Sequence, residues 1–256
     1  MKNCRLIQSP PQNGQKNMAT DLSLFKQFEE QAGGPTLRIY SWRPKCVSAG
    51  YSQSIEEEID LKKAELLGWD IVKRPTGGGI VFHNEAETTY SLVMAKDDPM
   101  LPKGLVPSYK KISEAVVFAL LLLGVKAEVA QSSPRLAGAR HPSPSPMERG
   151  MNFDDSRKKG VRSLCFSYPA EYEIVVDGRK IVGSAQKRGK VALLQQGSIF
   201  VCPTPSSAFE LLKKSHDLLN AISLEELLGR TPSVEELSTA LVKGFQEVFG
   251  ITFHEV

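Results

Sequence analysis

Three consecutive runs of β-forming residues between Glu171 and Val201 constrain the fold of this chain most strongly. Their sequences are "EYEIVVDG", "RKIVGSAQKR" and "VALLQQGSIFV". Asp177 and Gly178 end the first run, and an Asp-Gly pair adopts positive φ at low cost, which favours a tight hairpin turn. Strands joined by short turns pair antiparallel. This part of the chain therefore predicts neighbouring antiparallel strands in one sheet.

Helical patterns alternate with further strand patterns in the rest of the chain. Met18, Leu22, Phe25 and Phe28 recur at helical spacing before a Gly-Gly pair, and such spacing predicts an amphipathic helix. Further helices are expected over 54–69, 108–125, 206–222, 223–229 and 233–250, with capping boxes at Ser54/Glu57, Ser223/Glu226 and Ser233/Glu236. Further strands are expected over 36–42, 46–53, 70–74, 88–95 and 126–130. The predicted fold class is α+β: an α/β sandwich with a mixed, largely antiparallel sheet flanked by helices and a small helical C-terminal segment.

A long stretch without periodicity interrupts this pattern at 131–160, where proline, serine and charged residues dominate. A stretch of this length inside a compact domain is either a functional loop or a disordered one. We expect one catalytic domain over 1–203 and a helical C-terminal segment over 204–256 that can belong to the same domain. The boundary rests on the change to short helices after residue 203.

Composition excludes several classes of protein. The 256 residues are 41% hydrophobic and 24% charged, with a net charge of +3, which is too small to indicate nucleic-acid binding. The longest apolar run, Ala115–Val125, is too short to cross a bilayer, and no secretion signal is visible at the N-terminus. The four cysteines have no metal-ligand spacing. We therefore expect a reduced, cytoplasmic protein without a metal site and without a membrane partner.

The motif "RPTGGGIVFHN" places three consecutive glycines, Gly77, Gly78 and Gly79, between two strand patterns. Glycine loses the most conformational entropy on folding, so a run of three needs a cause. One interpretation is a tight turn or bulge. The other is a ligand lying against bare backbone, with Arg74 and His83 at the two ends binding its polar or anionic groups. No Lys-Ser pair follows, so the motif is not a P-loop.

A second unusual segment lies inside the run "RKIVGSAQKR". Gly183, Ser184 and Ala185 occupy strand positions where large side chains would ordinarily pack. Small residues in a strand let a slender ligand, such as an acyl chain, or another backbone approach closely. Lys180 begins this strand, and we expect it to be solvated unless it has a partner.

These segments, together with "RSLCFSYP", resemble the superfamily of biotin and lipoate protein ligases and octanoyltransferases. The glycine motif is shared across that superfamily, whereas the cysteine followed by "YE" and "GRKIVGSAQ" is most similar to the cysteine-dependent octanoyltransferases of lipoate assembly. The resemblance implies transfer of octanoyl from acyl carrier protein, through a cysteine thioester, to a lysine of a lipoyl-domain protein. Such acceptors are the glycine cleavage H protein and 2-oxoacid dehydrogenase E2. The nucleophile would be Cys165 and the assisting residue Lys180.

This chemistry has a physical rationale and several rivals. A free cysteine has a pKa of about 8.5, and a neighbouring ammonium favours the reactive thiolate. Exchange between thioesters requires neither ATP nor a cofactor. The alternatives are an ATP-dependent lipoate–protein ligase, an octanoyl amidotransferase acting between lipoyl-domain proteins, and an inactive module that only binds a lipoyl domain. Two positions depart from the family pattern: Asn84 replaces a common aspartate, and Gln196 replaces a common histidine.

Overall fold

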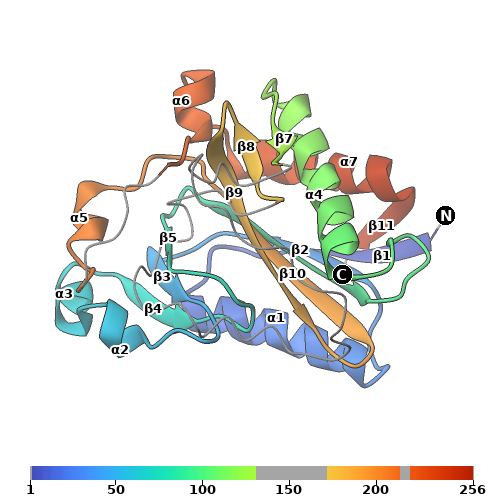
Figure 1. Ribbon diagram of the computed structural model, residues 1–256, viewed down its shortest axis with the longest axis horizontal. Helices are drawn as coiled ribbons and strands as arrows, with labels where there is room; N and C mark the ends of the chain where they lie inside the picture. Colours follow the sequence, from blue (N-terminus) through green and yellow to red (C-terminus); the bar gives the residue numbers. More distant parts are fainter. Residues whose placement is uncertain (1, 131–171, 214–219, 256) are drawn as a thin grey trace, which may run out of the picture.

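An eight-stranded sheet organises the protein (Figure 1). The structure is a computed structural model that describes residues 2–130, 172–213 and 220–255. The strand order is β11-β1-β2-β6-β10-β9-β8-β7. The strands span β1 (Lys2–Gln8), β2 (Thr36–Tyr40), β6 (Thr88–Ala95), β7 (Glu128–Val129), β8 (Ile174–Val176), β9 (Arg179–Arg188), β10 (Ala192–Ile199) and β11 (Ile251–Glu255).

The sheet is mixed and largely antiparallel, as the sequence predicts. Every neighbouring pair from β2 to β7 along the sheet is antiparallel, whereas β1 pairs parallel with both β2 and β11. The predicted hairpin turn is confirmed, because Asp177 and Gly178 both have positive φ, at 49° and 74°. The strands β1 and β11 were not predicted.

Alternating side chains give the sheet two buried faces. Along β6, Leu92 and Met94 belong to the large core, whereas Val93 between them belongs to a second cluster on the opposite face. The neighbouring strand β10 divides in the same way at Leu193 and Leu194. Because side chains of a strand alternate between faces, both faces require a covering layer.

Helices provide those two layers. The helix α1 (Gly14–Glu29) packs under the second cluster, with Leu24 and Phe25 against Val93. On the other face lie α4 (Leu105–Leu122) and α7 (Val234–Phe249), which pack against each other and close the large core. Figure 1 shows α1 on one side of the sheet and the α4–α7 pair on the other.

A smaller sheet of order β4-β3-β5 lies beside the main one. It consists of β4 (Asp70–Lys73), β3 (Cys46–Ala49) and β5 (Val81–His83), and it has its own apolar cluster around Val47, Trp69 and Phe82. Short helices complete this region and the chain beyond β10: α2 (Ile55–Glu58), α3 (Leu61–Leu66), α5 (Ser206–Phe209) and α6 (Leu224–Leu228).

Two helix predictions are wrong. The helix expected over 54–69 is broken at Ile59 and Asp60 into α2 and α3. Ser54 makes no capping bond, and the Asp60 side chain instead accepts from the Lys63 amide at the start of α3. The break buries Ile59 completely in the small cluster, so packing overrides the local capping signal. The helix expected over 206–222 is reduced to α5 within the described residues, whereas the capping boxes at Ser223 and Ser233 are confirmed.

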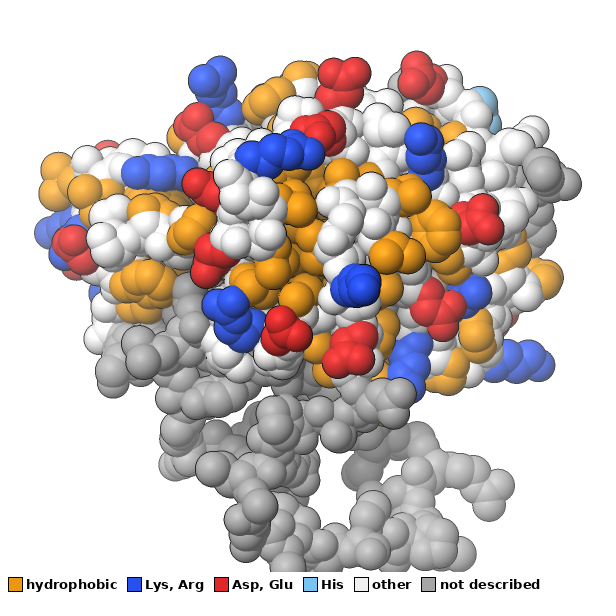
Figure 2. Space-filling model, turned by 90° about the horizontal axis from the view of Figure 1, so that it is seen from above, with side chains coloured by type: hydrophobic (Ala, Val, Ile, Leu, Met, Phe, Trp, Pro, Cys, Tyr) orange, Lys and Arg blue, Asp and Glu red, His pale blue; other side chains and the backbone are white. Residues whose placement is uncertain are grey.

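The C-terminal residues join the main sheet. The last strand β11 pairs with β1, and α7 contributes Leu241 and Phe245 to the large core. In the part of the chain that the structure describes, no helix is long and apolar enough to cross a membrane. Figure 2 shows one face of the molecule, on which acidic and basic side chains surround apolar ones.

Candidate active site

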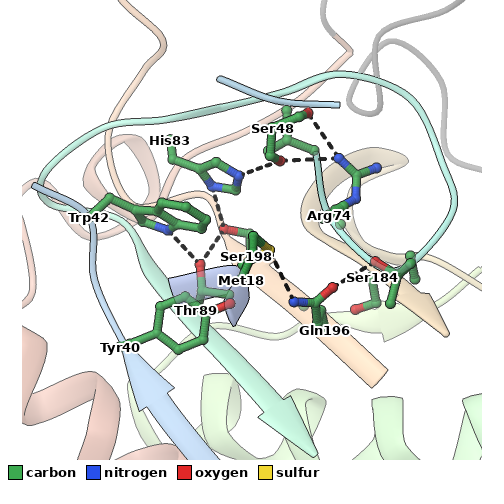
Figure 3. Close-up of a pocket in the computed structure, with 15 residues that line it drawn as sticks. Met18, Tyr40, Trp42, Ser48, Arg74, His83, Thr89, Ser184, Gln196 and Ser198 are labelled. Atoms are coloured by element: carbon green, nitrogen blue, oxygen red, sulfur yellow. Dashed lines mark hydrogen bonds between the residues drawn. The ribbon is translucent and has the colours of Figure 1, made fainter. Parts of the chain in front are cut away.

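A narrow pocket lies where the small sheet meets β6, β9 and β10 of the main sheet (Figure 3). The space within it, counted together with the open solvent at its mouth, is about 370 Å³. Its wall includes Met18, Tyr40, Trp42 and Val81, which are apolar or aromatic. Of the residues predicted to bind substrate, the wall contains Arg74, His83, Gly183, Ser184 and Ala185.

Arg74 holds the glycine loop in place. Its Nη2 donates to the carbonyl oxygens of Gly77 and Gly79 at 2.8 and 2.6 Å, and its Nε donates to Gly77 at 3.2 Å. Its Nη1 donates to the carbonyl and hydroxyl oxygens of Ser48 at 2.9 and 3.1 Å. A guanidinium has five N–H donors, and these contacts account for them. Arg74 therefore positions the glycine loop and Ser48, and its contact with an anionic group of a ligand stays a prediction.

Gly78 of the glycine run has a structural cause inside the protein, together with Gly50 of the neighbouring loop. A Cβ on Gly50 would lie 2.0 Å from the carbonyl oxygen of Gly78, so only glycine permits this approach of the two loops. Gly78 has a φ of 93°, which favours glycine. Gly77, Gly78 and Gly79 are not part of the pocket wall, whereas their neighbour Thr76 is. The loop therefore shapes the pocket through Thr76 and Arg74.

His83 is held on the pocket wall by contacts to both ring nitrogens. Its Nε2 lies 2.7 Å from the Ser48 hydroxyl, and its Nδ1 lies 3.0 Å from the Glu87 carboxylate. Trp42 stacks on the imidazole, with ring centroids 3.9 Å apart and an interplanar angle of 14°. All four residues are less than 9% exposed. The ring is therefore fixed in orientation and faces a serine and a carboxylate at once.

Two further hydroxyl groups connect this set to the sheet. Ser198 donates to the Glu87 carboxylate and lies 3.0 Å from Thr89, which accepts from the indole nitrogen of Trp42 at 2.9 Å. Figure 3 shows the contacts among Trp42, Thr89 and Ser198 at the pocket. Buried polar networks of this kind fix side-chain positions because each member restrains the next.

Gln196 connects the pocket wall to a buried charge pair. Its amide nitrogen donates to Asp21 at 2.7 Å, and its oxygen accepts from Thr76 at 2.7 Å. Asp21 also pairs with Arg38 at 2.8 Å, and both side chains are fully buried. Tyr40 donates to the same carboxylate, and burial raises the pKa of Tyr40 well above its usual value. Besides these two bonds to oxygen atoms, the Gln196 amide nitrogen donates to the Met18 sulfur at 3.4 Å.

The strand segment Gly183–Ala185 forms the wall of small residues. Tyr90 lies behind it, with its hydroxyl 3.2 Å from the Ser184 hydroxyl, and Tyr109 donates to the Ser184 carbonyl at 3.1 Å. On the neighbouring strand, a Cβ on Gly197 would lie 2.3 Å from the Tyr90 ring. The two tyrosines thus hold the segment Gly183–Ala185 by contacts with Ser184, and neither tyrosine is part of the pocket wall.

Lys180 is 1% exposed and is therefore not the solvated lysine that a turn would ordinarily carry. Its ammonium lies 2.8 Å from the Glu173 carboxylate. Burial raises the pKa of Glu173, while the charge of Lys180 and the Ser184 amide act in the opposite direction. Glu173 is therefore close to both Lys180 and the small-residue wall. Lys180 itself is not part of the pocket wall.

The predicted nucleophile Cys165 lies outside the described residues, so its role stays a prediction. Two of the other three cysteines are buried, as expected for structural thiols: Cys4 is 3% exposed and Cys46 is fully buried. Burial raises the pKa of Cys4 to about 11 and that of Cys46 well above its usual value. Cys202 is half-buried.

Sequence reasoning missed several residues of the wall. Ser48, Trp42 and Ser198 converge on His83 from three different strands or loops, and no local pattern marks them. Glu87 follows His83 by four residues, but this spacing brings side chains together in a helix. His83 ends the strand β5, so the spacing gave no usable signal.

Comparisons with known proteins agree with this architecture. The model of the lipoyl protein ligase A/B catalytic domain matches residues 13–246. Octanoyltransferase LipM of Clostridioides difficile is 32% identical to this chain, and the alignment covers 100% of this chain and 90% of that relative. The Geobacillus kaustophilus protein of the same name is 34% identical, and the alignment covers 92% of this chain and 82% of that relative. The structure of lipoate-protein ligase A with bound ATP has a TM-score of 0.75 and 25% identity to this chain. The structure of a lipoate protein ligase from Thermoplasma acidophilum with bound lipoic acid has a TM-score of 0.73 and 25% identity. Each comparison covers 100% of this chain and 89% of the solved chain. The chain belongs to the lipoyl protein ligase A/B catalytic domain family.

Proposed function

We propose that this protein is an octanoyltransferase of protein lipoylation. It takes octanoyl from octanoyl-[acyl carrier protein] and transfers it, through a thioester on Cys165, to a lysine of a lipoyl-domain protein. Glycine cleavage H protein and 2-oxoacid dehydrogenase E2 are the acceptors that we expect. The observation that carries the proposal is the narrow pocket beside the buried Lys180–Glu173 pair, in a chain whose relatives are named octanoyltransferases.

The pocket suits a saturated acyl chain. One wall is the small-residue segment Gly183–Ala185, and apolar side chains of Met18 and Val81 contribute to the rest. A slender hydrocarbon gains about 25 cal/mol for each Å² of apolar surface that it buries. Gly183, Ser184 and Ala185 therefore receive the chain, and the polar residues around His83 lie at its carbonyl end.

Lys180 activates the nucleophile in this scheme. An ammonium close to a cysteine favours the thiolate, and the contact with Glu173 fixes the Lys180 side chain. The thiolate of Cys165 attacks the thioester carbonyl, the bond to the carrier sulfur breaks, and the carrier leaves as a thiol after taking a proton. The acceptor lysine then attacks the enzyme thioester as a free amine and loses a proton, and Cys165 returns to the thiol or thiolate.

Relatives that are 32 and 34% identical are named octanoyltransferases, which supports transfer over ATP-dependent ligation. The contacts of Arg74 with the glycine loop and Ser48 do not separate the two functions, because the motif that contains Arg74 resembles both ligases and octanoyltransferases. The glycine loop itself lies against Gly50. A ligase is the second candidate because two structurally similar proteins are named lipoate protein ligases.

A transfer assay separates these candidates. The purified protein is mixed with an apo lipoyl domain and one of three octanoyl donors: octanoyl-[acyl carrier protein], free octanoate with or without ATP, or an octanoylated lipoyl domain of different mass. The apo lipoyl domain is weighed by mass spectrometry, and its binding to the protein is measured separately. We expect ATP-independent octanoylation that Cys165→Ala abolishes and Cys202→Ala leaves intact. Octanoylation only with ATP and free octanoate, surviving Cys165→Ala, would establish the ligase. Transfer only from an octanoylated lipoyl domain would establish the amidotransferase, and binding without transfer would establish the inactive module.

A further inference from the structure

Ser48, His83 and Glu87 have the connectivity of a serine–histidine–carboxylate triad. The Ser48 hydroxyl lies 2.7 Å from His83 Nε2, and the Glu87 carboxylate lies 3.0 Å from His83 Nδ1. We propose that these residues form a second nucleophilic site, which hydrolyses medium-chain acyl esters and thioesters without Cys165. This second site depends on the proposed octanoyltransferase function in one respect: both require that the pocket receives an acyl chain.

The two contacts use the two ring nitrogens in the order that catalysis requires. With the proton on Nδ1, the ring donates to Glu87 and its Nε2 accepts from the Ser48 hydroxyl. A carboxylate in this place holds the imidazole in that tautomer and stabilises the imidazolium when the serine proton arrives. The distances lie within hydrogen-bond reach for general base catalysis.

The surroundings restrain the histidine ring and isolate the carboxylate. Trp42 stacks on the imidazole with a centroid separation of 3.9 Å. Ser198 contacts both Glu87 and His83 Nδ1, the latter at 3.3 Å. Glu87 is fully buried and His83 is 4% exposed. A preorganised, buried acid–base pair of this kind needs little reorganisation when charge moves along it.

Ser48 lies on the wall of the pocket that would receive the acyl chain. It is on β3 and belongs to the wall of the same pocket as Gly183 and Ser184. Figure 3 shows Ser48 between Arg74 and His83. Arg74 Nη1 donates to its hydroxyl oxygen at 3.1 Å, and a positively charged donor at this atom favours the alkoxide over the hydroxyl. The Ser48 hydroxyl thus has His83 as the base for its proton and Arg74 as a cationic donor to its oxygen.

The reaction has two balanced steps. In the first, Ser48 Oγ attacks the acyl carbonyl, its proton moves to His83 Nε2, and the bond to the leaving oxygen or sulfur breaks as that atom takes the proton. An acyl ester of Ser48 forms. In the second step, water attacks this ester, His83 takes a proton from the water, and the bond to Ser48 Oγ breaks as that oxygen is reprotonated. The product is the free fatty acid.

A fluorophosphonate probe with an octyl chain tests the site directly, because phosphonylation requires an activated serine. The full-length protein and its Cys165→Ala variant are incubated with the probe, and the modified residue is mapped by peptide mass spectrometry. Hydrolysis of p-nitrophenyl octanoate is measured on the same preparations. We expect modification at Ser48 in both proteins, and hydrolysis that Cys165→Ala retains.

Variants then separate a catalytic from a structural role. Ser48→Ala should abolish labelling and the hydrolysis that Cys165→Ala retains, and Glu87→Gln should slow both at least tenfold while keeping the hydrogen-bond geometry. The matched control is Ser113→Ala on α4, a buried serine whose hydroxyl donates to the Tyr109 carbonyl at 3.0 Å. Melting temperatures report whether each variant folds.

Three results would overturn the proposal. They are no phosphonylated residue in the wild type, a modified residue other than Ser48, or hydrolysis lost with Cys165→Ala while Ser48 stays unmodified. Mapping in the wild type needs no variant, so the outcome holds even if Ser48→Ala fails to fold. Loss of octanoyl transfer in Cys165→Ala, measured on the same preparations, tests the proposed function separately.

Discussion

The buried pair of Lys180 and Glu173 allows a quantitative prediction about stability. Both side chains are nearly inaccessible, at 1% and 7%, and their charged atoms are 2.8 Å apart. Removing one partner of such a pair leaves an uncompensated buried charge, which costs about 3–5 kcal/mol. Glu173→Gln and Lys180→Met should each lower the free energy of unfolding by about this amount at pH 7. The double variant should be within about 1–2 kcal/mol of the wild type, because no buried charge remains.

The pH dependence follows from the raised pKa of Glu173. A carboxyl whose folded pKa lies above its unfolded value stabilises the fold below the unfolded value, near 4.5, and this contribution is lost as pH rises through the folded value. Lys180→Met removes the charge that lowers the Glu173 pKa, so this variant should lose more stability at pH 8 than at pH 5. Urea unfolding at pH 5 and pH 8 measures the free energy of unfolding of the wild type, of both single variants and of the double variant. Additive losses in the double variant, or single variants as stable as the wild type, would refute the reasoning.

The remaining predictions concern the glycine loop and the thiols. Gly50→Ala should destabilise the protein by about 1–3 kcal/mol and abolish transfer, because its Cβ would lie 2.0 Å from the Gly78 carbonyl oxygen; an unchanged melting temperature would contradict this. Alkylation by iodoacetamide at pH 8 should modify Cys165 first, since the rise of the Cys4 pKa from 9.0 to about 11 leaves roughly 100-fold less thiolate. Cys4 and Cys46 should react only after unfolding, and their early modification, mapped by peptide mass, would show that they are accessible.

The fold was largely predictable because its strands are local in sequence. The Asp177-Gly178 turn and the three runs around it indicated antiparallel neighbours, and β8, β9 and β10 are adjacent in the sheet. The strands β1 and β11 were missed, since Lys2 pairs with Ile251 at the opposite end of the chain. A short strand whose partner is that distant has no turn or hairpin signal.

The candidate site was predictable only in part. The unusual residue types, a histidine after the glycine run and a small-residue strand segment, drew attention to His83 and Gly183–Ala185, and all of these are in the pocket wall. Their partners were not predictable, because Ser48 is 35 residues from His83 and Gln196 is 175 from Asp21. The contacts of Arg74 with the glycine loop were not predictable either, because the direction of its donors depends on the loop backbone.

Intact-mass spectrometry of the acylated enzyme tests the central claim most directly. The protein is mixed with octanoyl-[acyl carrier protein] without ATP and without an acceptor, and then treated with neutral hydroxylamine, which cleaves thioesters. We predict the addition of one octanoyl group, mapped to Cys165 and removed by hydroxylamine, and its absence in Cys165→Ala. An unmodified wild-type protein that still octanoylates a lipoyl domain, or a wild-type protein whose only octanoyl group resists hydroxylamine and maps to a residue other than Cys165, would contradict a thioester at Cys165.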